Sequence, residues 1–185
     1  RRIKNKIPII SLVGYTNSGK STLFNLITKS KVLSKNMLFA SLDSTIRNGY
    51  INGFNLNFID TVGFIRDLPT TLIDSFKSTL NEIINSDLIL HVRDISDAEY
   101  LDQKNEVLRI LEDIGIQRDD ERIIEVINKI DLVKNKINHH NSLSEKSVMI
   151  SAVNGSGISE LKNIIIKNLS RYNLINFLHQ QSYQV

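Results

Sequence analysis

The sequence contains no cysteine among its 185 residues. A disulfide framework and a thiolate metal site are therefore both excluded, and a cytoplasmic location is expected. No run of about 18 apolar residues occurs, so no transmembrane segment is predicted. Internal repeats and low-complexity linkers are also missing. What is left is a chain of ordinary globular composition, long enough for one well-packed domain and too short for two.

Charge says little about partners, because 23 Lys and Arg residues oppose 20 Asp and Glu residues for a net charge of +3. That value favours an anionic partner such as RNA only weakly, and an ordinary surface explains it equally well. The basic first residues lead into a short apolar run and a glycine loop, which is not the pattern of a signal peptide. We expect a piece of a longer protein, with one domain over residues 1–170 and a tail over 171–185 that starts a further segment.

Short apolar runs of strand length alternate with longer stretches at helical spacing, which predicts an α/β fold. Runs that are nearly continuously apolar suit strands buried on both faces of a mostly parallel sheet, with helices on each face. The predicted strands are Ile7–Val13, Leu88–Val92, Ile123–Ile127 and Val148–Ile150. The predicted helix stripes are Leu72, Phe76, Leu80 and Ile84; Leu101, Leu108, Leu111 and Ile114; and Ile158, Leu161, Ile165 and Leu169.

One segment departs from this alternation. Gly49–Ile51 and Phe54–Ile59 flank Asn52-Gly53, a dipeptide that strongly favours a two-residue hairpin turn. We expect one antiparallel hairpin attached to the parallel sheet. Before it, Leu33–Arg47 is predicted to be an irregular stretch, and a long loop in a compact domain is usually functional.

Residues 14–21 read Gly-Tyr-Thr-Asn-Ser-Gly-Lys-Ser and fit the pattern G-x-x-x-x-G-K-[ST]. They follow a predicted strand and open a predicted helix at Ser21, the context that a phosphate-binding loop requires. Glycines let backbone N–H groups turn toward phosphate oxygens, and the helix N-terminus adds partial positive charge. Lys20 is expected to reach the β- and γ-phosphates, and Ser21 to ligate Mg²⁺. A glycine turn with a chance Gly-Lys-Ser is the alternative, and the motif alone does not specify the base.

Asn128-Lys129-Ile130-Asp131 follows a predicted strand, and ligands of α/β sheets bind beyond the carboxyl ends of strands. Guanine presents its N1–H and 2-amino group side by side, so Asp131 can accept from both, whereas adenine would leave this carboxylate unpaired. Asn128 can bond the base edge and neighbouring loops, and the stem of Lys129 can lie along the ring. Taken alone, the motif also fits a helix cap or turn.

A later stretch, Ser151-Ala152-Val153-Asn154-Gly155, follows the last predicted strand. A backbone N–H near Ala152 could donate to guanine O6. An ordinary strand-to-helix turn explains the same residues, so this stretch adds modest weight to a guanine site.

Asp60-Thr61-Val62-Gly63 ends the second strand of the hairpin. Asp60 is placed to hold Mg²⁺ through water, and Gly63 can offer the γ-phosphate a backbone N–H without a side chain in the way. The hydroxyls of Ser41, Ser44 and Thr45 are candidates to complete the Mg²⁺ shell. A plain turn after a strand is the alternative.

With these motifs in this order, the chain resembles the translation-factor-related P-loop GTPases, and more specifically the HflX family. The resemblance covers Ile7 to about Leu169 and is carried by residues 14–25, by Leu38-Phe39-Ala40-Ser41-Leu42-Asp43-Ser44-Thr45-Ile46-Arg47, and above all by Asp60-Thr61-Val62-Gly63-Phe64-Ile65-Arg66-Asp67-Leu68-Pro69. It implies a six-stranded GTPase domain that binds GTP or GDP with Mg²⁺, and binding to the ribosome, especially its large subunit.

The motifs and the resemblance together define the expected site. The expected nucleotide contacts are Gly14, Tyr15, Thr16, Asn17, Ser18, Gly19, Lys20, Ser21, Thr22, Phe39, Ala40, Ser41, Leu42, Asp43, Asp60, Thr61, Val62, Gly63, Asn128, Lys129, Asp131, Ser151, Ala152 and Val153. The expected metal ligands are Ser21, Ser41 and Asp60, with Thr45 as the fallback, and the catalytic positions are Lys20, Gly63 and Phe64.

The chain departs from the family pattern in four places. Ser18 replaces an alanine, which costs little because the loop binds through its backbone. Ser41 replaces the threonine that closes over Mg²⁺ and keeps the hydroxyl, while Ser44 replaces a proline and leaves the loop freer. Arg93 stands where an apolar strand residue is usual, and the sequence offers no account of it.

Phe64 follows the Asp-x-x-Gly motif, where many relatives carry a glutamine that orients water. Phenylalanine cannot form that hydrogen bond, so we expect slow intrinsic hydrolysis, with Phe64 swinging aside and the ribosome as activator. A hydrophobic anchor for the switch is an equally good interpretation. Asn17 either binds K⁺ beside the phosphates or only shapes the loop.

Three functions remain open at this point. The first is a slow GTPase switch, expected to be monomeric, that acts on the large ribosomal subunit. The second is a nucleotide-gated binding module with negligible hydrolysis. The third is a GTPase of RNA modification or ribosome assembly, against which residues 60–69 argue.

Overall fold

The computed structural model describes residues 7–29, 45–61, 63–64, 80–133 and 144–171. Within them, six strands form one sheet in the order β2-β3-β1-β4-β5-β6. The β2–β3 pair is antiparallel, and the other pairs are parallel. The elements are β1 (Ile9–Val13), α1 (Lys20–Thr28), β2 (Thr45–Ile51), β3 (Phe54–Asp60), β4 (Leu88–Asp94), α3 (Tyr100–Asp113), β5 (Ile123–Asn128), the 3₁₀ turn η2 (Ile130–Leu132), β6 (Ser147–Met149) and α4 (Ile158–Arg171), and residues 80–84 are helical.

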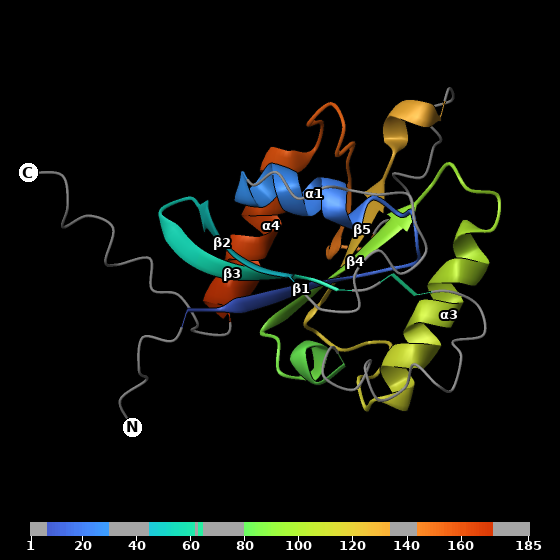
Figure 1. The fold of residues 1–185 in the computed structure, drawn as a ribbon, viewed down its shortest axis with the longest axis horizontal. Coiled ribbons are helices and arrows are strands. Elements are labelled where there is room, and N and C mark those ends of the chain that lie inside the picture. Colours follow the sequence, from blue (N-terminus) through green and yellow to red (C-terminus); the bar gives the residue numbers. More distant parts are fainter. Residues whose placement is uncertain (1–6, 30–44, 62, 65–79, 134–143, 172–185) are drawn as a thin grey trace, which may run out of the picture.

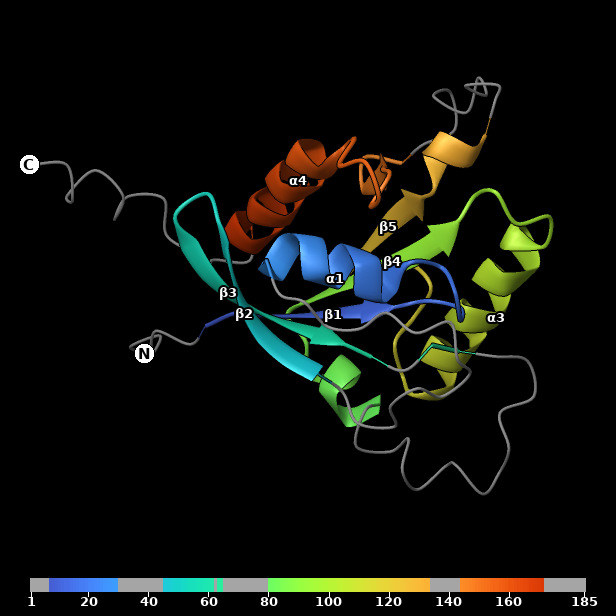
Figure 2. The ribbon, with the colours of Figure 1, turned by 45° about the horizontal axis from the view of Figure 1, so that its top comes forward.

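Helices cover both faces of the sheet, which confirms the predicted α/β architecture (Figure 1). On one face α1 and α4 pack on a cluster that includes Phe24 and Leu161. On the other face α3 and the helical residues 80–84 pack on a second cluster, which includes Ile83, Val107 and Leu111. Figure 2 shows α1 and α4 together on one side of the sheet and α3 on the other. Because the central strands are buried on both sides, most of their residues are apolar, and this made them predictable.

The hairpin is confirmed at its turn and corrected at its start. Asn52 and Gly53 both have positive φ, 48° and 90°, as a tight two-residue turn requires. The ladder runs without a break from Ile51 opposite Phe54 to Thr45 opposite Asp60. The last three residues of the stretch expected to be irregular, 45–47, are therefore strand. The prediction failed there because β2 is an edge strand with exposed polar residues, so it lacks an apolar pattern.

The α4 stripe is confirmed, and the other two helix stripes are partly wrong. Ile158, Leu161, Ile165 and Leu169 are all buried. In α3, however, Leu101 is 54% exposed while Val107 is fully buried, and in the helical residues 80–84 the buried side chain is Ile83 and not Ile84. In the stripe that ends at Ile84, a strict four-residue spacing drifts away from the 3.6-residue helical repeat, which misplaced that position. The spacing of the α3 stripe is helical, and its error is that the apolar Leu101 lies on the exposed part of the helix.

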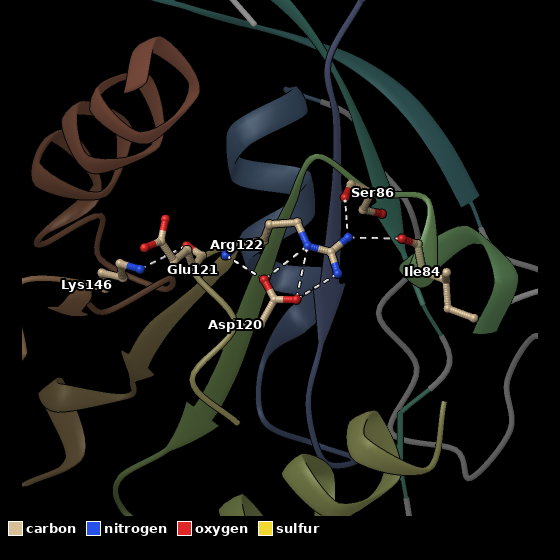
Figure 3. A network of polar contacts seen from close by, with 6 residues as sticks. All are labelled: Ile84, Ser86, Asp120, Glu121, Arg122 and Lys146. Carbon is tan, nitrogen blue, oxygen red and sulfur yellow. Dashed lines mark hydrogen bonds and ion pairs between the residues drawn. The ribbon is translucent and has the colours of Figure 1, made fainter. Parts of the chain in front are cut away.

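A network of charged and polar contacts lies at the end of the sheet where β4 and β5 begin (Figure 3). The Arg122 guanidinium donates through Nε and Nη2 to the Asp120 carboxylate, at 3.1 and 2.8 Å. Its Nη1 donates to the carbonyls of Ile84 and Ser86, at 3.0 and 3.1 Å. Arg122 therefore fastens the end of the helical residues 80–84 to the start of β5.

Some of the predicted residues lie outside the described ranges. They are Phe39, Ala40, Ser41, Leu42, Asp43, Ser44, Val62, Leu72, Phe76 and the tail after Arg171, which itself ends α4. In the part of the chain that the structure does describe, none of the helices has the length and apolarity of a membrane span.

Candidate nucleotide-binding site

The loop from Gly14 to Gly19 joins the end of β1 to the start of α1. A Cβ on Gly14 would collide with the Val92 carbonyl oxygen, and one on Gly19 would collide with Asn128 Nδ2. Both glycines also have positive φ, so the loop can follow this path only with glycine at these positions. The first turn of α1 carries no acidic residue that would offset the partial positive charge of its N-terminus. The loop therefore presents the geometry and polarity of an anion site.

Lys20 is folded over this loop. Its buried Nζ donates to the carbonyls of Gly14 and Tyr15, at 3.0 and 2.8 Å. Burial lowers the pKa of Lys20 to about 8, against the opposing effect of the Asp60 charge. A poorly solvated ammonium in this position favours the arrival of an anion.

Asp60 and Ser21 meet beside Lys20. Asp60 ends β3, aligned with Leu12 of β1, and Thr61 secures the following turn because its Oγ1 donates to the Leu12 carbonyl at 2.6 Å. Burial raises the pKa of Asp60, while a hydrogen bond from Ser21 and the charge of Lys20 act in the opposite direction.

The carboxylate oxygen Asp60 Oδ1 is buried and has no hydrogen-bond partner. A buried acidic oxygen with open lone pairs, next to a hydroxyl, is the kind of ligand set that Mg²⁺ takes. Ser21 and Asp60 therefore fit the predicted metal. Thr45, the fallback ligand, stands opposite Asp60 in the β2–β3 ladder.

Gly63 and Phe64 lie directly against the phosphate loop. The Phe64 N–H donates to the Gly14 carbonyl at 3.1 Å, and the Thr16 N–H donates to the Phe64 carbonyl at 2.8 Å. A Cβ on Gly63 would lie 2.9 Å from Thr16 Cα and 3.1 Å from Lys20 Nζ, so a side chain there would push the two segments apart. The Phe64 side chain is fully buried in the cluster beneath α3, as the anchor interpretation expected.

Asn128 joins three parts of the site. Its Nδ2 donates to the Ser18 carbonyl of the phosphate loop at 2.9 Å, and its Oδ1 accepts from the Ala152 N–H at 3.0 Å. The contact with neighbouring loops was predicted for Asn128. The Ala152 N–H was predicted to donate to guanine O6, and in this structure its acceptor is Asn128. Its role toward the base stays a prediction.

The other base-site residues lie around Asn128. Asp131 is exposed in η2, Ser151 is fully buried, and Val153 is 79% exposed. Because the Ile130 N–H donates to the Ile150 carbonyl, the two loops that carry these residues are held together. The exposed carboxylate and the exposed valine are thus both available to a base.

Arg93 has a partner that the sequence did not reveal. It lies on the α3 side of β4, where its Nη2 donates to Glu125 Oε2 of β5 at 3.2 Å and its guanidinium lies 5.7 Å from the centre of the Tyr100 ring. Glu125 also pairs with Lys104 at 2.5 Å. The Nε and Nη1 groups of Arg93 are buried without a hydrogen-bond partner. Arg93 and Glu125 are 32 positions apart, so no local pattern could have predicted this contact.

Asp94 is a further residue of this region that was not predicted from the sequence. It ends β4 at the same sheet edge as the base motif and forms an ion pair with Lys129 at 2.6 Å. An acidic residue at the carboxyl end of a buried strand was the available signal.

Comparisons with known proteins agree with this geometry. A family model described as "50S ribosome-binding GTPase" matches residues 9–129. "GTPase HflX" of Lacrimispora saccharolytica is 44% identical over 166 residues, which cover 89% of this chain and 39% of that protein. "GTPase HflX" of Escherichia coli is 39% identical over 173 residues, which cover 91% of this chain and 40% of that protein. The chain thus spans about two fifths of the length of these relatives.

Among solved structures, a GTP-binding protein from the archaeon Sulfolobus solfataricus in complex with GDP superposes with a TM-score of 0.72 at 27% identity. The match covers 89% of this chain and 53% of that one. Fold, loop geometry and sequence agree. The chain belongs to the P-loop GTPases of the 50S ribosome-binding GTPase family, and within them to the HflX group.

Proposed function

We propose that this chain binds GTP with Mg²⁺ and hydrolyses it slowly to GDP and phosphate. The observation that carries the proposal is the cluster of the buried Lys20 with the half-buried Ser21 and Asp60, beside a glycine loop at a helix N-terminus. Lys20 would exchange its loop carbonyls for the β- and γ-phosphates, and Ser21 and Asp60 would hold the metal. Mg²⁺, when bound, neutralises charge that develops on the phosphate oxygens.

The base preference rests on Asp131, the exposed carboxylate that follows Asn128 and Lys129. A carboxylate accepts from both adjacent donors of guanine, and binding adenine would leave it unpaired. We expect Asp131→Asn to lose most GTP binding and to gain xanthosine triphosphate, whose 2-oxo group accepts where guanine donates. Calorimetry with both nucleotides measures the exchange. If the parent took up ATP as readily as GTP, the proposal would fail.

Hydrolysis needs a water in line with the γ-phosphate, and the side chain at the usual water-orienting position is the buried Phe64. Slow intrinsic turnover follows, because Phe64 cannot form a hydrogen bond with that water. Single-turnover hydrolysis by the parent and by Phe64→Gln, each with and without ribosomes, tests this. Fast turnover by the parent alone would contradict it.

A nucleotide-gated binding module with negligible hydrolysis is the second candidate, and the same burial of Phe64 favours it. A parent that binds GTP tightly but shows no phosphate release, even with ribosomes, would support the module over the enzyme.

The proposed partner is the ribosome, especially its large subunit, in line with the description of the family. We expect the full-length protein to sediment with large subunits in GTP and to be released in GDP. Sedimentation with small subunits only, or in both nucleotide states alike, would contradict this. We further propose a monomeric, cytoplasmic protein, which gel filtration and cell fractionation check.

A K⁺ ion beside the phosphates is proposed at Asn17, which is exposed and held at a φ of 60° in the phosphate loop. A monovalent cation there would add positive charge next to the triphosphate. Equal hydrolysis rates in KCl and NaCl would exclude it.

A further inference from the structure

The last residue of β4 is bonded on both of its carboxylate oxygens. Asp94 is 8% exposed. Its Oδ1 accepts from the Ser96 N–H at 2.9 Å and from the Ser96 hydroxyl at 2.5 Å. Its Oδ2 forms the ion pair with Lys129 Nζ at 2.6 Å. The turn after β4 therefore fixes the carboxylate, and the carboxylate in turn fixes the end of a lysine side chain.

Lys129 is constrained at its other end as well. Its backbone has a φ of 66°, a left-handed conformation between the end of β5 and η2. The preceding residue, Asn128, stands opposite Asp94 in the parallel ladder, and its carbonyl accepts from the Ile95 N–H at 3.1 Å. The Lys129 side chain is only 20% exposed. A long side chain held at both its backbone and its ammonium has few rotamers left to lose.

The base site lies on these same strand ends, because Asn128 reaches both the phosphate loop and Ala152. A lysine stem offers an apolar surface to a purine ring when its ammonium is held elsewhere. Ordering a free lysine stem against a ligand costs conformational entropy, and a stem that is already ordered avoids that cost. Asp94 is placed to order the Lys129 stem in this way, because its carboxylate holds the Lys129 ammonium.

We infer that Asp94 is a positioning residue for guanine nucleotides. It holds the Lys129 side chain extended where the base will lie, so that this side of the base site is already formed before the nucleotide binds. The inference rests on the proposed function, and it adds a residue that touches neither base nor phosphate. The Asp94 carboxylate acts only through Lys129.

A double-mutant cycle tests the inference on the 185-residue chain. The variants are Asp94→Asn, which keeps an oxygen for the Ser96 N–H but removes the charge, Lys129→Met, which keeps a linear stem without the ammonium, and the double variant. The measurement is the dissociation rate of fluorescently labelled GDP, with thermal melting of each variant as a check on folding. Asp102→Asn, on the exposed first turn of α3, makes the same charge change as a matched control.

We expect Asp94→Asn to release GDP about fivefold to tenfold faster, the factor that corresponds to one side chain ordered on binding. The same substitution should have no effect once Lys129 is methionine, and Asp102→Asn should leave the rate unchanged. An unchanged rate in Asp94→Asn, or an equal acceleration in the Lys129→Met background, would overturn the inference and leave the proposed function intact. A parent that binds no GDP would overturn the proposed function and this inference with it.

Discussion

At the scale of single residues, His91 is the clearest case of a group whose charge state is set by its surroundings. It lies in β4, 1% exposed, on the same side as Arg93 and Lys104. Burial, followed by the charges of Arg93, Lys104 and Lys20, lowers the pKa of His91 to about 3. The imidazole therefore stays neutral in the folded protein throughout the physiological range.

This pKa has a consequence for acid stability. Between about pH 6.5 and pH 3 the unfolded chain binds a proton at His91 that the folded chain does not, so stability is lost as the pH falls. We predict that His91→Leu loses less stability over this range, by about 1 kcal/mol per pH unit. Urea unfolding of parent and variant at pH 7 and pH 5 measures the difference. Parallel losses in the two proteins would contradict the prediction.

In the pair of Arg93 and Glu125, we expect the loss of Glu125 to lower the unfolding free energy more than the loss of Arg93. Arg93→Val removes two buried N–H groups that lack partners and leaves Glu125 with Lys104, so we expect a change in unfolding free energy within about 1 kcal/mol, and of either sign. Glu125→Ala leaves two cations without their carboxylate and should cost about 3 kcal/mol. Equilibrium urea unfolding of both variants checks the order. A larger loss for Arg93→Val would refute it.

A role could be predicted for residues that belong to a contiguous sequence motif. It could not be predicted for residues whose contacts are with a partner far away in the sequence. Gly14, Lys20, Asp60 and Asn128 stand at fixed offsets in contiguous motifs, so a role in the site could be predicted for each of them from the chain alone. Asp94 and Arg93 depend on which strand lies next to β4, and that contact exists only in three dimensions.

At the scale of elements, Arg122 and Arg118 form a matched pair of arginines on the stretch between α3 and β5. Arg122 bonds the Asp120 carboxylate and also the carbonyls of Ile84 and Ser86, at and just after the end of the helical residues 80–84. Arg118 is 48% exposed and pairs only with Glu112 on α3 among the ion pairs of the described residues. We expect Arg122→Ala to cost about 2 kcal/mol of unfolding free energy, because the carbonyls of Ile84 and Ser86 lose a charged donor. Arg118→Ala should cost less than about 0.5 kcal/mol.

Urea unfolding of the two alanine variants gives both values, and Arg122→Lys separates charge from geometry. Lysine carries the charge but cannot span the carboxylate and both carbonyls with one planar group. Full recovery of stability by Arg122→Lys, or equal losses at the two positions, would show that the network contributes nothing specific.

Elements buried on both faces were easier to predict than elements at an edge. The central strands matched their apolar runs because both of their faces meet the core, and α4 matched its stripe because the stripe is the one side of the helix that packs on the sheet. The start of β2 did not, since an edge strand with Arg47 and Asn48 exposed has no such pattern. In α3 the apolar Leu101 lies at an exposed position, which the sequence could not distinguish from Val107.

At the scale of the whole molecule, the site draws on β1, β3, β4 and β5 and on the loop before α4, so a bound nucleotide should stabilise the entire domain. A ligand at about one hundred times its dissociation constant adds about 2.7 kcal/mol to the unfolding free energy. For a domain of this size we expect GDP with Mg²⁺ to raise Tm by roughly 5–10 °C.

Differential scanning fluorimetry across a GDP titration measures the shift, with ATP at the same concentrations as the control. ATP should leave Tm unchanged if Asp131 selects the base as proposed. A rise with ATP that equals the rise with GDP would show that phosphate contacts alone account for binding.

Alternation of strands and helices predicted the layers of the molecule, and the number of strands came from the family resemblance. The order of strands in the sheet did not follow from local pattern, because nothing within one strand specifies its neighbour. The predicted switch residues 39–43 lie outside the described residues, so their part in the site stays a prediction.

The burial of Phe64 sets the free energy that any partner must supply to move this residue away from the phosphate loop. Exposing a fully buried phenylalanine costs about 2 kcal/mol, and the two backbone hydrogen bonds to the phosphate loop add about 1 kcal/mol each. The sum, about 4 kcal/mol, corresponds to roughly one molecule in a thousand with Phe64 exposed when no partner is bound. A partner that works by capturing this rare form must bind it at least a thousandfold more tightly than the form with Phe64 buried. A partner with a smaller preference would bind and leave Phe64 mostly buried.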